Sequence, residues 1–201
     1  FGDEVRTFCM NPNGEVVQEN YNGISTVNGH SYAEKTTNNT NFALLVSEKF
    51  TEPFKEPIQY GQHIARLANM LAGGILVQRF GDLLDGRRST PERIKSSIIK
   101  PTLTCATPGD LSLVIPYRQM TSIIEMLQAL DKVCPGTASR YTLLYGIEVK
   151  FYSARVKLTN NLETEGVKNL FAIGDGAGVT RGLIQASASG VHAARTICER
   201  G

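Results

Sequence analysis

The feature that most constrains the fold of this chain is a glycine-rich turn near its C-terminal end. An apolar run from Leu170 to Ile173 has the length and composition of a buried strand, and closely spaced glycines follow it at once. A helix is expected from about Leu183 to about Glu199, because small or apolar residues recur there at helical spacing. The sequence therefore predicts a strand, a glycine loop and a helix in succession.

This succession suits an anionic ligand. Glycines let the backbone approach a ligand closely, and the N–H groups at the start of a helix point at negative charge. The same pattern also occurs where a tight turn is the only requirement, so both interpretations stand on the pattern alone. A dinucleotide-binding G-x-G-x-x-G turn is excluded, because Val179 occupies the third glycine position and only one helix follows the loop.

The closing stretch resembles the last motif of flavoprotein oxidoreductases of the glutathione-reductase-like superfamily, in which a strand ends in Gly-Asp and a helix follows. Gly174 and Asp175 form that pair here. The fuller resemblance is to the bacterial NAD(P)/FAD-dependent oxidoreductases, also called FAD-dependent dehydrogenases. The other stretches that carry it are residues 8–17, 28–31, 41–45, 144–153 and 162–164.

The resemblance implies an α+β fold and the C-terminal portion of such an enzyme. Residues 1–147 would form a substrate or cap domain, which combines an antiparallel sheet with helices. Residues 148–201 would supply the closing strand, loop and helix of a discontinuous α/β FAD-binding domain, whose first strand–turn–helix would lie upstream of Phe1. Without those partner strands, the closing part is expected to pack as an appendage or to pair with another chain, and a homo-oligomer is one such arrangement.

The resemblance also implies which residues hold FAD. Asp175 would accept a hydrogen bond from a ribityl hydroxyl, since a carboxylate beside a pyrophosphate needs a donor between them. The helix start would aim its positive end at the flavin and favour the reduced form. The alternative is that Asp175 only caps the glycine loop. The predicted cofactor-binding residues are Gly174, Asp175, Gly176, Ala177, Gly178, Gly182, Leu183 and Ile184.

The catalytic residues are not identified, but Cys9 and Lys150 are candidates. Members of the family usually carry a second cysteine and a Gly-Gly near the first stretch, and Asn11 and Asn13 stand at those places here. Cys9 therefore has no adjacent disulfide partner, and a buried thiol on a strand is the simpler interpretation. Lys150 would stabilise a flavin anion if it lies near the ring; on an exposed strand face it would be solvated.

Composition narrows the class of partner. The 201 residues carry 21 basic and 19 acidic side chains, a formal net charge of +2, which is too balanced for a nucleic-acid-binding platform. No apolar run approaches the length of a membrane span. The four cysteines form no C-x-x-C pair and no cluster with histidine, so we expect reduced thiols, no metal site and a cytoplasmic protein.

The rest of the chain predicts strands, then helices, then strands again. Strands are expected over residues 4–10, 15–19, 24–27, 30–33 and 42–47. Because Asn22-Gly23 and Asn28-Gly29 favour hairpin turns, these strands are predicted to form an antiparallel meander. Residues 78–88 are ambiguous. Helices are expected over residues 57–72, 91–97 and 116–133, and strands over 143–145 and 148–152.

The leading hypothesis is therefore the C-terminal part of an FAD-dependent oxidoreductase of unknown substrate, with NAD(P)H as a candidate electron donor. No pyridine-nucleotide site is visible in these residues. The alternative is a flavin-binding or RNA-modification-related module without redox turnover. Reduction of the bound flavin by NADH or NADPH distinguishes the two hypotheses.

Overall fold

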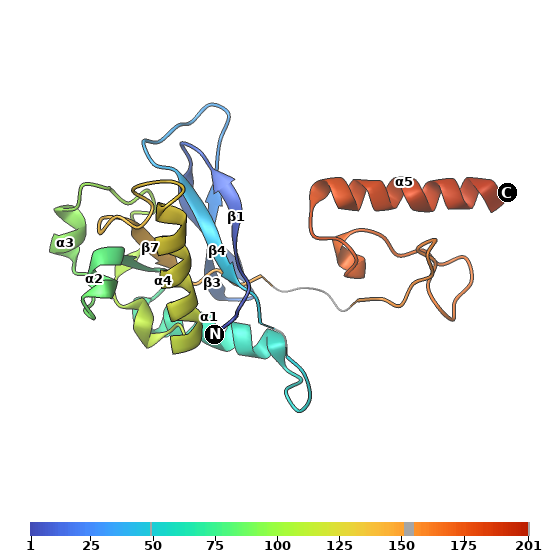
Figure 1. The fold of residues 1–201 in the computed structure, drawn as a ribbon, viewed down its shortest axis with the longest axis horizontal. Helices are drawn as coiled ribbons and strands as arrows, with labels where there is room; N and C mark the ends of the chain where they lie inside the picture. The colour runs from blue at the N-terminus through green and yellow to red at the C-terminus, as the bar shows by residue number, and fades with distance from the viewer. Residues whose placement is uncertain (49, 151–154, 201) are drawn as a thin grey trace. The chain divides into compact units, whose positions relative to one another are not determined.

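The computed structural model describes residues 1–48, 50–150 and 155–200, and the chain divides into two compact units, Phe1–Val149 and Lys150–Gly201. The predicted α+β class is confirmed: small, largely antiparallel sheets are combined with several helices (Figure 1). Within the described ranges, no helix is both long and apolar enough to cross a membrane. Assignment of a substrate or cap domain to the first unit and of FAD binding to the second stays a prediction.

Two antiparallel strand pairs form the N-terminal part of the first unit. β2 (Glu15–Tyr21) and β3 (Ile24–His30) make a hairpin, and its turn at Asn22-Gly23 has left-handed φ angles of 52° and 80°. β1 (Val5–Asn11) pairs instead with β4 (Asn41–Val46). The predicted meander is therefore wrong, because β1 does not pair with β2, its neighbour in the sequence, but with β4.

The second predicted turn, at Asn28-Gly29, is also wrong. β3 continues through both residues to His30, and Gly29 lies opposite Val16 in the hairpin ladder. The strand expected over residues 30–33 is not formed beyond His30. Glycine has a packing reason here, since a Cβ at this position would overlap the side-chain amide of Asn41.

The three expected helices are present, each with a local reason for its end or start. α1 (Pro57–Ala72) ends at Gly73, which adopts the left-handed φ of 68° common after a helix. α3 (Pro91–Lys95) is capped by Thr90, whose hydroxyl accepts a backbone N–H of the first turn. α4 (Tyr117–Asp131) carries one apolar face and packs on β4 and β1.

The ambiguous stretch 78–88 begins as a strand and continues as a helix. β5 (Leu76–Arg79) is the central strand of a three-stranded sheet, antiparallel to β7 (Leu143–Gly146) and parallel to β6 (Thr107–Pro108). α2 (Phe80–Leu84) follows β5 directly. The strand expected over residues 143–145 is thereby confirmed, whereas β5 itself was not anticipated.

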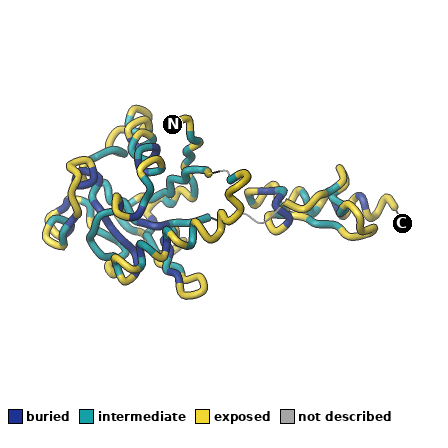
Figure 2. The backbone as a smooth tube through the Cα atoms, turned by 90° about the horizontal axis from the view of Figure 1, so that it is seen from below, coloured by how far each residue is buried: buried dark blue, intermediate teal, exposed yellow. Residues whose placement is uncertain are grey.

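The core of the first unit lies where α1, α2 and α4 meet these strands, and Figure 2 shows buried residues concentrated in this unit. The short 3-10 helix η1 (Leu111–Leu113) contributes Leu111. A Cβ on Gly146 would come 2.7 Å from Leu111 Cδ2, so the glycine permits a close backbone approach. The buried core residues are Ala68, Leu76, Phe80, Leu83, Leu111, Val114, Met120, Leu127 and Ile147.

The second unit has little regular structure before its closing helix. The strand expected over residues 148–152 is not formed at 148–150, and Phe151 and Tyr152 lie outside the described residues. The buried strand predicted from Leu170 to Ile173 is wrong. Within it, Phe171 forms only an isolated bridge, with Glu163, and the two end residues are about half exposed. An apolar run becomes a buried strand only when neighbouring strands pair with it and cover it.

The unit closes with two elements. η2 (Asp175–Ala177) is a single 3-10 turn, and α5 (Leu183–Arg200) confirms the expected final helix. α5 is 18 residues long but buries only Ala193 and Thr196. The glycine turn, which contains η2, therefore follows an irregular segment rather than a strand.

Candidate functional site

The glycine turn of the second unit is set by its backbone conformation. Gly174 has a φ of 71° and Gly178 a φ of 72°, both in the left-handed region that favours glycine. Between them, the N–H groups of Ala177 and Gly178 donate to the carbonyls of Gly174 and Asp175, at 3.3 and 2.9 Å. Two of the predicted glycines are thus required by the chain itself, whatever ligand the turn holds.

The side chain of Asp175 is hydrogen-bonded within the loop that leads from the turn to α5. Its Oδ1 accepts a hydrogen bond from the hydroxyl of Thr180, which is only 9% exposed. Asp175 itself is exposed, and an ionised carboxylate has about four acceptor positions. Capping of the loop is therefore present, and it is compatible with a second donor from a ligand. Sequence reasoning missed Thr180, for which the available signal was a hydroxyl residue shortly after Gly-Asp.

The start of α5 brings polar and apolar groups together. The N–H of Ala186 donates to the carbonyl of Gly182 at 2.9 Å, so the N–H groups of Leu183, Ile184 and Gln185 precede the first such bond of the helix. Leu183 and Ile184 are 88% and 81% exposed. The positive end of this helix therefore carries backbone donors beside two exposed apolar side chains.

A serine that the sequence analysis did not select ties the loop to the helix. The N–H of Gly174 donates to Ser189 Oγ at 3.0 Å, and that hydroxyl donates to the carbonyl of Ala186 at 2.7 Å. The glycine at position 190 also leaves space for Ile173, whose Cδ1 would lie 3.7 Å from an added Cβ. The series of small residues in the first turns of α5 was the signal for this close approach.

The two catalytic candidates lie in different units. Cys9 is exposed on β1, at an irregularity in the pairing with β4, and has a positive φ of 45°. The buried-thiol interpretation is therefore wrong. The Asn11 amide donates to the Cys9 carbonyl at 2.6 Å and to Asn41 Oδ1 at 2.9 Å, so it helps to hold this bulge. Lys150 opens the second unit, is partly buried and is not in a strand.

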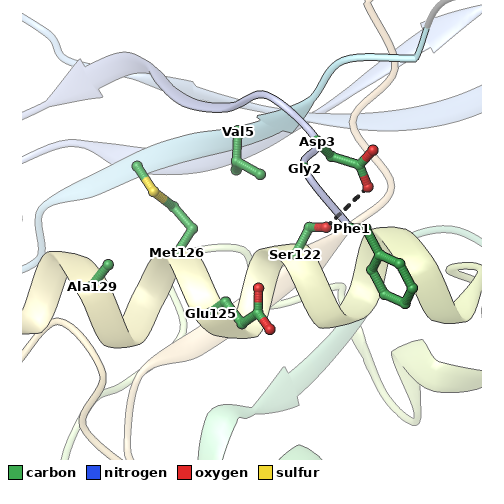
Figure 3. Close-up of a pocket in the computed structure, with 8 residues that line it drawn as sticks. All are labelled: Phe1, Gly2, Asp3, Val5, Ser122, Glu125, Met126 and Ala129. Carbon is green, nitrogen blue, oxygen red and sulfur yellow. Dashed lines mark hydrogen bonds between the residues drawn. The ribbon is translucent and has the colours of Figure 1, made fainter.

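The first unit has a cavity of about 270 Å³ between its N-terminal segment and α4 (Figure 3). The hydroxyl of Ser122 donates to Asp3 at 3.3 Å, and Arg118 donates to the same carboxylate at 2.8 Å. The hydrogen bond from Arg118 holds the pKa of Asp3 below its usual value. None of the predicted site residues lines this cavity.

Comparison with known proteins places the chain in a family. A family model described as "FAD-dependent protein, C-terminal domain-like" matches residues 2–151, which is most of the chain. The chain belongs to this family of FAD-dependent proteins. An uncharacterised protein of Clostridium beijerinckii is 33% identical over 208 aligned residues, and the match covers 98% of this chain. The chain spans 38% of the length of that relative.

Membership in the FAD-dependent family indicates FAD as the cofactor of the full protein. The residues of the closing turn fit part of the FAD molecule. Gly176 is exposed, and a Cβ there would meet no atom within 4 Å, so a ligand can approach its backbone. Asp175 offers an acceptor for a hydroxyl, and the start of α5 offers N–H donors beside apolar Leu183 and Ile184. A ribityl chain joined to a flavin ring needs these kinds of contact. FAD held there would supply hydride or electron transfer.

Proposed function

We propose that this chain is the C-terminal part of an FAD-dependent oxidoreductase, and that Gly174–Gly178 with the start of α5 binds the flavin-side half of FAD. The observation that carries the proposal is the left-handed glycine turn, which carries the exposed Asp175 and is joined to α5 by the hydrogen bond from the Gly174 N–H to Ser189. Membership in a family of FAD-dependent proteins supports the flavoprotein part of the proposal, and the family match covers residues 2–151, ahead of the glycine turn.

Each part of the turn has a separate role in this proposal. Asp175 accepts a hydrogen bond from a ribityl hydroxyl, and Gly176 lets the ligand lie close to the backbone. The N–H groups of Leu183 and Ile184 face the electron-rich edge of the flavin ring. The helix dipole contributes about 0.3–1 kcal/mol there and favours the reduced, negatively charged form. NAD(P)H is the proposed electron donor, and residues 1–147 are the proposed substrate or cap domain.

A segment outside this chain is proposed to hold the adenosine and most of the pyrophosphate. The amphipathic helix α5 supports this, because Val191 and Ile197 are about half exposed on a helix that buries few of its side chains. A helix of an α/β domain normally covers a sheet with its apolar face. The greater length of the matched relative also supports an additional segment.

The main test removes the carboxylate of Asp175 in the full-length protein. A charge-assisted hydrogen bond is worth about 1.5–3 kcal/mol, so Asp175→Ala should weaken FAD binding about ten-fold or more. Glu199→Ala, which removes an exposed acid near the far end of α5, is the matched control and should leave FAD affinity unchanged. Unchanged FAD content in a folded Asp175→Ala protein would remove this residue from the site.

A second variant separates ligand binding from loop capping. Thr180→Val removes the hydroxyl that Asp175 accepts within the loop but keeps the carboxylate. If Asp175 acts only as a cap, Thr180→Val should weaken FAD binding as much as Asp175→Ala does. The oxidoreductase assignment is tested by mixing the FAD-loaded protein with NADH or NADPH under anaerobic conditions. Persistence of the oxidised flavin absorbance with both donors would contradict NAD(P)H-dependent turnover.

A further inference from the structure

A buried carboxylate in the first unit gathers three arginines. Asp82, on α2, is 1% exposed. Its Oδ1 lies 3.0 Å from Arg87 Nε, and the Nε atoms of Arg79 and Arg93 lie 4.0 Å from its two oxygens. Ser89 donates its hydroxyl to the same carboxylate at 2.8 Å. A charge so fully removed from water requires compensation of this kind.

A second carboxylate extends the group at the surface. Asp85 accepts a hydrogen bond from Arg140 Nη2 at 2.6 Å and forms an ion pair with Arg87 Nη2 at 3.1 Å. Arg140 approaches α2 across Gly81, where a Cβ would lie 2.8 Å from Arg140 Cβ and 2.9 Å from its carbonyl oxygen. Glycine at position 81 is therefore needed for this approach. Arg79, Arg87, Arg93 and Arg140 are called the arginine cluster below.

The loop that carries Arg87 is held by a buried polar network. Gln78 is fully buried; its Nε2 donates to the Arg87 carbonyl at 2.9 Å, and its Oε1 accepts from the Leu111 N–H at 2.8 Å. Ser89 Oγ accepts the N–H of Arg79 at 2.8 Å. Buried networks whose members are all paired hold side chains in one arrangement. The exposed arginines are thus presented by a preorganised frame.

The arginine cluster has more positive charge than its own carboxylates neutralise. Its four guanidinium groups share two carboxylates, which leaves an excess of two positive charges. Arg88 and Glu92 on the same segment offset one another. Arg79 stacks on the ring of Tyr141 at 5.3 Å, and its buried Nε has no hydrogen-bond partner. The excess charge on the exposed guanidinium groups favours an anionic ligand.

We propose that the arginine cluster of the first unit binds the phosphate dianion of a small phosphomonoester, through residues other than those of the glycine turn. A phosphomonoester carries about −1.5 to −2 charges at pH 7, which matches the excess, whereas a carboxylate matches only half of it. The side chains of Arg87 and Arg140 are 49% and 55% exposed, so their forked N–H groups are accessible to such a ligand. Asp82 and Asp85 orient the guanidinium groups and neutralise only two of their four charges.

The test measures binding of inorganic phosphate and of glycerol 3-phosphate by calorimetry, at pH 7.5 and constant ionic strength. The full-length protein is used with excess FAD. The cofactor then occupies its own site, and added phosphate cannot bind there. Arg140→Gln should weaken both ligands about ten-fold, because one charge-assisted contact is lost. Arg118→Gln is the matched control: it removes an arginine of similar exposure, 53%, that also pairs with one aspartate. It should leave both affinities unchanged.

A gain-of-affinity variant completes the test. Asp85→Asn releases Arg140 and Arg87 from a competing carboxylate, so it should tighten phosphate binding about three-fold or more. Glycerol should not bind any variant. Three results would overturn the proposal: no phosphate binding beyond that of chloride, equal affinities in Arg140→Gln and Arg118→Gln, or weaker binding in folded Asp85→Asn. Each would mean that the arginine cluster is a structural ion-pair network only.

Discussion

Replacing Asp82 with asparagine tests how far burial determines the stability of the arginine cluster. The amide keeps the shape and can still accept the hydroxyl of Ser89, but it leaves the charge of Arg79, 16% exposed, without its buried partner. Breaking a buried ion pair by removing one member costs about 3–5 kcal/mol. Because Arg87 and Arg93 are 49% and 36% exposed and water screens them, we expect the lower end, about 3 kcal/mol.

Asp85→Asn is the matched control for this measurement. Asp85 also contacts two arginines, but it lies at the surface, where an ion pair contributes little to the free energy of unfolding. Urea unfolding is followed by far-ultraviolet circular dichroism, since the chain has no tryptophan. With a slope of about 1–3 kcal/mol per molar urea, a loss of about 3 kcal/mol in Asp82→Asn should lower the midpoint by about 1–3 M at unchanged slope. Equal midpoints for the two variants would refute the reasoning, because they differ mainly in the burial of the carboxylate.

Three further predictions concern ionisation, the thiol and the cofactor. The hydrogen bond from Arg140 holds the pKa of Asp85 below its usual value. The contribution of Asp85 to stability is therefore complete above the usual pKa and is lost as the pH falls through the lowered pKa. A carboxyl NMR titration of Arg140→Gln should show a higher midpoint for Asp85. Cys9→Ser should leave stability and flavin reduction nearly unchanged, because the thiol is exposed; lost turnover in a folded, FAD-loaded variant would make Cys9 catalytic. The 201-residue chain alone should be colourless, with an FAD dissociation constant no better than about 1 mM; stoichiometric flavin absorbance would show that no further segment is needed.

Two Asn-Gly pairs show the limit of local reasoning. Asn22-Gly23 forms the expected hairpin turn, with both residues at positive φ. Asn28-Gly29 has the same sequence but lies inside β3, because β2 extends far enough to pair with it and the Asn41 side chain occupies the space above Gly29. The dipeptide permits a turn, and the partner strand decides whether the turn forms.

Hydrophobicity misjudges the burial of the apolar run at residues 170–173 and of the polar residue Gln78 in opposite directions. The run was expected to be a buried strand, yet no ladder covers it in the part of the second unit that the structure describes. Gln78 gave no sign of burial, yet it is fully buried because the backbone of Leu111 and Arg87 satisfies its amide. Burial depends on the packing and hydrogen-bond partners that the tertiary structure supplies, whereas hydrophobicity describes only the preference of the residue itself.

The sequence by itself determined the features that depend on a few neighbouring residues. These are the cap of Thr90 on α3, the end of α1 at Gly73, and the left-handed turn between Gly174 and Gly178, all of which follow from backbone preferences. The tertiary structure alone decided that β1 pairs with β4 and that Arg140 meets Asp85 across Gly81. Those contacts join residues far apart in the chain, and their energy comes from pairing and burial that no short stretch of sequence contains.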